Sequence, residues 1–169
     1  MTLESLLLEK RADIVRGWID RTLALFPAST GVFLRTTEDR FDNPVGEAIF
    51  SHMGPLFDAL LENAPREAVE PHLDPIVQIR SIQDCSASEA LSFVFLLKDV
   101  LRQEAGDALH DSRGEPLREF DGRIDRLALL AFDRFIGFKQ KVYEIRIKEI
   151  KNSVSTLLKM SNLTCDDPK

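Results

Sequence analysis

The amino-acid sequence predicts an all-α fold, a helical bundle from which one long C-terminal helix extends. Apolar residues recur at helical spacing along most of the chain, and no stretch alternates apolar and polar residues as a half-buried strand would. Between residues 117 and 160 there is no proline, and good helix formers dominate. The 169 residues are 44% hydrophobic and 30% charged, which provides enough apolar surface for one core and therefore predicts one domain.

Charge and composition argue against several classes of function. The formal net charge of −6 repels a phosphate backbone, so nucleic acid is not an expected partner. No basic segment precedes Leu6, Leu7 and Leu8, and no apolar stretch approaches the about 20 residues that span a bilayer. Cys85 and Cys165 lack the spacing of a zinc site or a disulfide framework. These features predict a soluble, cytoplasmic protein without a membrane partner.

The first part of the chain is expected to form helices separated by prolines and turn residues. Residues 2–26 have an amphipathic pattern and predict one helix that Pro27 ends. Residues 28–42 predict an ordered loop with a short helix. Four of its apolar side chains are expected to pack under the bundle: Val32, Phe33, Leu34 and Phe41. Asn43 and Pro44 then mark a helix start, because an Asn side chain caps free amides and proline suits the first turn.

Prolines are expected to interrupt the next two segments. The helix that begins after Asn43 should reach residue 63, with a kink or split at Pro55, which has no amide donor. A segment that opens at Pro65 should be broken up by Pro71 and Pro75 for the same reason.

Ser86 and Glu89 have the spacing of a capping box, in which each side chain satisfies the backbone amide of the other residue. They predict a helix that runs to Ala105, followed by a polar loop at residues 107–116. Apolar residues on most sides of this helix indicate a central element surrounded by others. They are Leu91, Phe93, Val94, Phe95, Leu96 and Leu97.

The last helix is expected to cover residues 117–160, a length of about 60 Å that exceeds a compact domain. Its first part can pack on the body through Phe120, Ile124, Leu127, Ala131, Phe135 and Phe138. Its second part has apolar residues at alternating spacings of four and three, the pattern of a coiled-coil seam. These seam residues, expected at a dimer interface, are Tyr143, Ile147, Ile150, Val154 and Leu157. We therefore divide the chain into a helical body at 1–138, a coiled-coil helix at 139–161 and a flexible tail at 162–169.

Several short motifs, taken in their order along the chain, carry a family resemblance. They are residues 18–22 (WIDRT) with 26–27 (FP), 40–46 (RFDNPVG), 79–84 (IRSIQD) with 93–98 (FVFLLK), 120–125 (FDGRID) and 131–133 (AFD). Together they resemble the RsbRD N-terminal domain family, named after an RsbT co-antagonist of the bacterial stress-response stressosome. The resemblance covers nearly the whole chain.

The resemblance implies a sensor module that in relatives precedes a signalling domain, such as a STAS domain or a histidine kinase. Related stressosome sensor domains have a globin-like fold, form dimers and carry no haem. The sequence departs from this multidomain pattern, because it ends shortly after the long helix with no effector domain. We expect either a module that acts in trans or a piece of a longer protein.

Five residues are candidates for ligand contact: Arg80, Gln83, Asp84, Phe93 and Phe132. The polar three precede the central helix, where they either tie down a loop or contact a polar ligand. The two phenylalanines either belong to the core or line a pocket for an apolar signal molecule. Basic residues within 139–151 indicate a solvated coiled-coil flank or a docking site for an acidic partner.

No cofactor, metal or catalytic site is predicted. His52, His72 and His110 are candidate ligands for a metal or haem, but only His52 has an apolar helical context. Cys85, just before a helix, is either a redox sensor or a buried, inert thiol. No nucleophile, base and orienting residue can be grouped from the sequence, so an enzyme is not expected.

The leading hypothesis is a non-enzymatic bacterial sensory and signal-transduction module. It would dimerise through its C-terminal helix and relay a signal to a partner or an effector domain. The alternative is a globin-like protein that binds haem or a small apolar ligand. The first hypothesis places function on the exposed seam, and the second places it in a pocket of the body.

Overall fold

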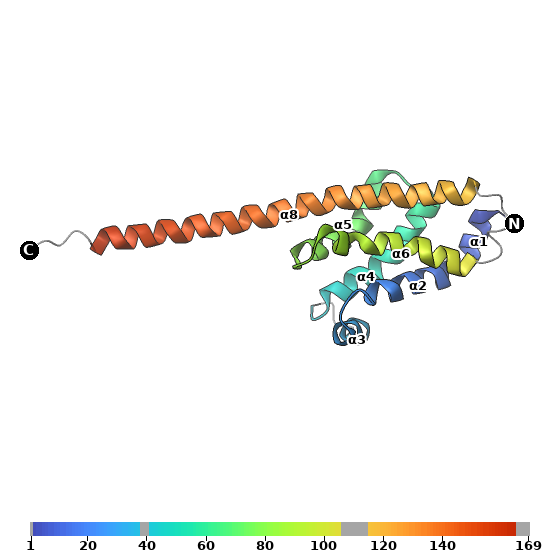
Figure 1. Cartoon of the computed structure of the whole chain (residues 1–169), viewed down its shortest axis with the longest axis horizontal. Helices are drawn as coiled ribbons and strands as arrows, with labels where there is room; N and C mark the ends of the chain where they lie inside the picture. The colour runs from blue at the N-terminus through green and yellow to red at the C-terminus, as the bar shows by residue number, and fades with distance from the viewer. Residues whose placement is uncertain (1, 38–40, 106–114, 165–169) are drawn as a thin grey trace, which may run out of the picture.

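Helices account for all regular structure in the described residues, which are 2–37, 41–105 and 115–164 of a computed structural model. In chain order they are α1 (Leu3–Glu9), α2 (Arg11–Leu23), α3 (Ala28–Thr36), α4 (Pro44–Leu61), α5 (Arg66–Ile82), α6 (Ala87–Ala105) and α8 (Glu115–Thr164). The shorter helices gather around the first half of α8, and its second half extends away from them (Figure 1). The predicted all-α class with a long C-terminal helix is confirmed, and the arrangement agrees with the globin-like class that the resemblance implies.

The N-terminal region forms two helices, so the prediction of one helix over residues 2–26 is wrong. The Thr2 side chain caps α1, and the chain turns at Lys10 before α2 begins. At this break Lys10 Nζ donates to the backbone oxygen of Glu104 at 2.6 Å, which ties the turn to the end of α6. α2 ends at Leu23, earlier than predicted, and Pro27 lies at the N-cap of α3.

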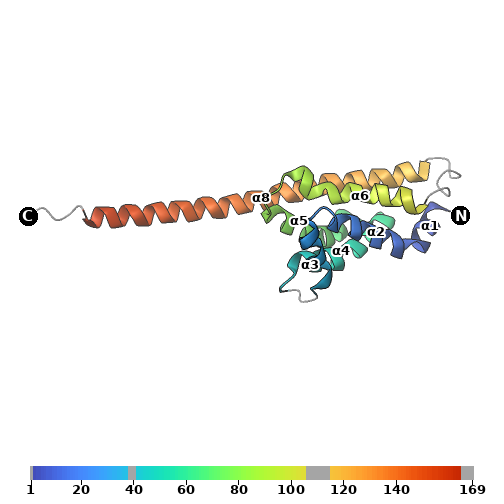
Figure 2. The same ribbon diagram turned by 60° about the horizontal axis from the view of Figure 1, so that its bottom comes forward.

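The expected short helix after Pro27 is α3, but most of the apolar side chains predicted to pack under the bundle from residues 28–42 do not do so. Leu34 is buried, whereas Val32, Phe33 and Phe41 are exposed, Phe41 to 91%. α3 lies at the edge of the body in both views (Figures 1 and 2), and its buried residues are Gly31 and Leu34.

The prolines of α4 and α5 do not interrupt their helices, which corrects the predicted breaks. α4 continues through Pro55, and α5 continues through Pro71 and Pro75. Each proline removes one backbone hydrogen bond, but the two helices pack against each other and bury side chains next to the prolines. Leu56 and Leu73, for example, are fully buried. Tertiary burial therefore outweighs the local cost.

The core is centred on Trp18, whose ring is fully buried. The indole stacks on Phe93 with ring centroids 6.3 Å apart, and its Nε1 donates to the Phe93 carbonyl at 2.6 Å. α8 closes another side of this core. Its residues predicted to pack on the body do so, with Phe138 half-buried and the others buried: Phe120, Ile124, Leu127, Ala131 and Phe135.

α6 begins with the predicted capping box. The Ser86 amide donates to Glu89 Oε2 at 2.8 Å, and the Glu89 amide donates to Ser86 Oγ at 3.3 Å. The helix is less enclosed than predicted, because Phe95 is 49% exposed. Residues 107–114 of the predicted loop lie outside the described part of the chain, and α8 already begins at Glu115. Among the described residues, no helix is both long and apolar enough to cross a membrane.

Asn43 caps α4 as predicted, and it also ties α3 to α4. Its Oδ1 accepts from the Gly46 amide at 2.9 Å, and its Nδ2 donates to the carbonyls of Leu34 and Thr37, each at 2.9 Å. A Cβ at Gly46 would lie 2.2 Å from Asn43 Nδ2, so glycine is required beside this cap. Since Asn43 is only 3% exposed, water does not replace these bonds.

Replacing Asn43 with alanine should lower the free energy of unfolding by about 2 kcal/mol or more, because a helix cap and the donors to two carbonyls are lost together. Urea unfolding followed by circular dichroism measures this change. Asn152→Ala is the matched control, since Asn152 is exposed on α8 and its replacement should stay within about 0.5 kcal/mol. Equal effects of the two substitutions would contradict the capping role of Asn43.

Candidate functional site

The second half of α8 carries the predicted seam on an exposed surface. Every side chain from Tyr143 to Ser161 is exposed. The seam residues themselves are between 48% and 65% exposed: Tyr143, Ile147, Ile150, Val154 and Leu157. Figures 1 and 2 show this part of the helix clear of the body in both orientations.

Two further exposed apolar residues continue the seven-residue spacing of the seam toward the body. Ile136 and Leu129, which are 47% and 69% exposed, lie one and two heptads before Tyr143. Neither residue was predicted as part of the seam, although both follow the seven-residue spacing in the sequence. The interleaved positions are apolar only after Tyr143, at Ile147 and Val154. Before it they are polar: Arg126, Asp133 and Gln140. A two-sided seam therefore begins near Tyr143.

Arg80 and Gln83 meet at the junction between α5 and α6. Arg80 Nη1 donates to Gln83 Oε1 at 2.6 Å, and Arg80 Nη2 donates to the Glu89 carbonyl at 3.0 Å. The guanidinium lies 4.8 Å from the centroid of the Phe26 ring. Burial has the largest influence on the pKa of Arg80 and lowers it. Cys85 Sγ donates to the Arg80 carbonyl at 3.6 Å. These contacts favour a structural role for Arg80, which ties the junction to the start of α6.

The other three candidate residues do not join Arg80 and Gln83 in one site. Asp84 is exposed, Phe93 is buried against Trp18, and Phe132 is 47% exposed on α8. Arg80 and Phe93 do share a cavity, but its volume is about 10 Å³. That space holds at most one water molecule, so it leaves no room for a signal molecule.

Two of the three histidines come together between α4 and α5. The ring centroids of His52 and His72 are 5.8 Å apart, and the Nδ1 atom of each is buried without a hydrogen-bond partner in the described part of the chain. Burial most strongly lowers the pKa of His52, His72 lowers it further, and Glu47 opposes the change. His110 and Cys165 lie outside the described residues. The described residues contain no group of three His, Cys, Asp or Glu side chains that could hold a metal ion.

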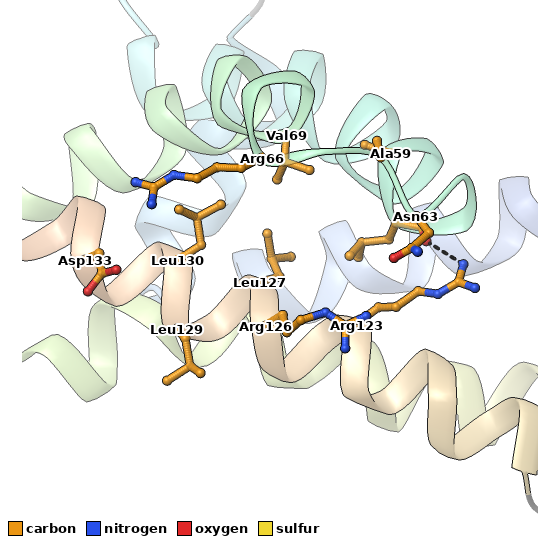
Figure 3. A pocket seen from close by; sticks show the side chains of 12 residues that line it. Ala59, Asn63, Arg66, Val69, Arg123, Arg126, Leu127, Leu129, Leu130 and Asp133 are labelled. Carbon is orange, nitrogen blue, oxygen red and sulfur yellow. Dashed lines mark hydrogen bonds between the residues drawn. The ribbon is translucent and has the colours of Figure 1, made fainter.

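A groove of about 370 Å³ lies between the α4–α5 turn and α8 (Figure 3). Leu127 and Leu130 project from α8 toward Val69 of α5, and Leu129 points away from them. Three arginines also line the groove: Arg66, Arg123 and Arg126. This groove could not be predicted from the sequence, because its two sides are more than 50 residues apart in the chain and neither contains a binding motif.

Most of the chain matches a known protein family. Residues 12–148 match the family described as the RsbT co-antagonist protein RsbRD N-terminal domain. No curated protein matches the chain, and no solved structure matches it. The matched range covers the body from α2 onward and the first exposed turns of α8.

His52 should make stability depend on pH. Because the folded state lowers the pKa of His52, the unfolded chain binds this proton more readily. The contribution of His52 to the free energy of unfolding should therefore be fully present above about pH 6.5, and it should decrease as the pH falls below that value. Urea unfolding at about pH 8 and about pH 5.5, where most carboxylates stay ionised, measures the slope. His52→Gln should flatten it, and an unchanged slope would rule out His52 as its source.

Proposed function

Because this chain belongs to the RsbT co-antagonist protein RsbRD N-terminal domain family, a regulatory family of stressosome-type sensory domains, we propose that it is a non-enzymatic signalling module. It forms a parallel homodimer through the second half of α8. The dimer relays a signal from the helical body to a cytoplasmic signalling partner or effector domain, of STAS or histidine-kinase type.

The exposed seam is the observation that carries this proposal. Five large apolar side chains, each about half exposed or more, follow a heptad pattern on the part of α8 that extends beyond the body. Full burial of such a side chain contributes about 1.5–3 kcal/mol, so a second seam is a favourable partner. An isolated helical extension is also marginally stable in water, and pairing stabilises it.

A parallel pair suits a relay. It places two bodies at one end and both C-terminal ends of α8 at the other. The first half of α8 packs on α5 and α6, so a shift within the body changes how the paired helices meet. Such a pair is a two-state element, and a ligand biases it only by binding one arrangement more tightly.

The alternative haem hypothesis has less support. His52 and His72 contact each other, and neither lines the cavities of about 370, 250 and 10 Å³. A haem iron would need one of these imidazoles to face an open pocket.

Replacing Ile150 with Asp should dissociate the dimer. The substitution places two like charges in an apolar interface, and each unpaired buried charge costs several kcal/mol, which exceeds what about three heptads can offset. Size-exclusion chromatography with light scattering should show a dimer for the unmodified chain and a monomer for the variant. Circular dichroism should show that the body keeps most of its helicity, because its core does not use Ile150.

Asn152→Asp is the control for this substitution. It adds the same charge to the same part of α8, two residues from Ile150 and off the seam, and should leave the dimer intact. A dimer that survives Ile150→Asp would refute the seam assignment. An unmodified chain that is monomeric at micromolar concentration would refute the dimer itself.

A further inference from the structure

We propose that the groove between the α4–α5 turn and α8 binds an amphipathic carboxylate, an alkyl chain with one terminal carboxyl group. Binding as such needs only the folded body. The idea that this ligand acts as the input to α8 rests on the function proposed above.

The groove has apolar walls. Leu60, Val69 and Leu127 line it and are buried at 5%, 7% and 3% exposure, and Ala64 and Leu130 are half-buried beside them. Its volume of about 370 Å³ lies near the lower end of the range for small-molecule pockets, about 300–1,000 Å³. The matching occupant is therefore one small molecule with an apolar chain.

Charge is unevenly distributed along the groove. In Figure 3, Arg123 and Arg126 lie together toward one end of the groove, and Asp133 lies at the other. Near the Asp133 end, the Arg66 guanidinium is already paired with Glu70 at 2.6 Å. An anionic group is thus repelled by Asp133 and attracted to the opposite end, which fixes the orientation of the ligand.

The two arginines at the basic end differ in their partners. Arg123 donates to the carbonyls of Leu60 and Leu61 at 3.1 and 2.8 Å and pairs with Glu119 at 2.9 Å. Arg126 is exposed and makes no hydrogen bond or ion pair with any described residue. One guanidinium therefore remains available for the ligand, and its planar fork matches the two oxygens of a carboxylate.

The chemistry of the ligand follows from Arg126, the arginine of the groove that has no partner among the described residues. An alkyl carboxylate offers one negative charge for Arg126 and an apolar chain for Leu127 and Leu130. A neutral alcohol of the same length leaves the guanidinium without its ionic partner. An alkylammonium ion is repelled by it.

The position of Arg126 links the groove to the long helix. Arg123, one turn earlier on α8, already binds the C-terminal carbonyls of α4. A ligand held by Arg126 and Val69 would bridge α8 and α5 next to this tie, where a change in spacing is transmitted directly to α8.

Titration of the isotope-labelled full chain, followed by amide chemical shifts, tests the proposal. Octanoate should bind saturably, with the largest shifts at the α4–α5 turn and in residues 123–130. Octanol and octylammonium should each bind at least about tenfold more weakly, because a hydrogen bond to a charged group contributes roughly that factor or more. Arg126→Gln should weaken octanoate binding about tenfold and abolish its advantage over octanol.

Arg118→Gln is the matched control. Arg118 is another exposed α8 arginine without a partner among the described residues, and it does not line the groove. Its replacement should leave octanoate binding unchanged. The inference is overturned by absence of saturable octanoate binding, by equal binding of octanol or octylammonium, or by equal effects of the two substitutions. Light scattering tests the proposed dimer separately, so groove binding to a monomeric chain would remove only the proposed relay.

Discussion

The buried indole of Trp18 is the interaction on which the body depends. Its ring stacks on Phe93, and its N–H must find an acceptor within the protein because the side chain is fully buried. The acceptor is the backbone carbonyl of Phe93, a fixed point on α6 rather than a mobile side chain. α2 and α6 therefore pack in one register, and the buried faces of α4, α5 and α8 enclose what remains of the apolar surface.

The sequence was sufficient to predict features that depend only on neighbouring residues. The caps at Asn43 and Ser86 act within three residues of a helix start, and both were predicted correctly. The break at Lys10 could not be predicted, because it accompanies a contact with Glu104 that lies 94 residues away. The prolines of α5 were misread for a related reason: the burial of neighbours such as Leu73 outweighs the lost backbone bonds.

The same division separates the two candidate functional surfaces. The seam lies on one helix, so its heptad spacing is written in consecutive residues and the sequence reveals it. The groove is assembled from the α4–α5 turn and α8, which are distant in the sequence. At its basic end, only the structure shows that Arg123 binds the carbonyls of α4 whereas Arg126 has no partner among the described residues. A list of arginines in the sequence does not distinguish these two roles.

The length of α8 has a mechanical consequence. The helix is continuous over 50 residues, about 75 Å, and only its first half is held by the body. A rod held in this way is a lever whose fulcrum lies where the helix leaves the body. A small tilt of the helix where it leaves the body displaces its C-terminal end in proportion to the length of the unsupported part. A rotation about the helix axis, by contrast, turns the C-terminal end through the same angle. The C-terminal end of α8 therefore amplifies tilting of the body and faithfully copies its twist.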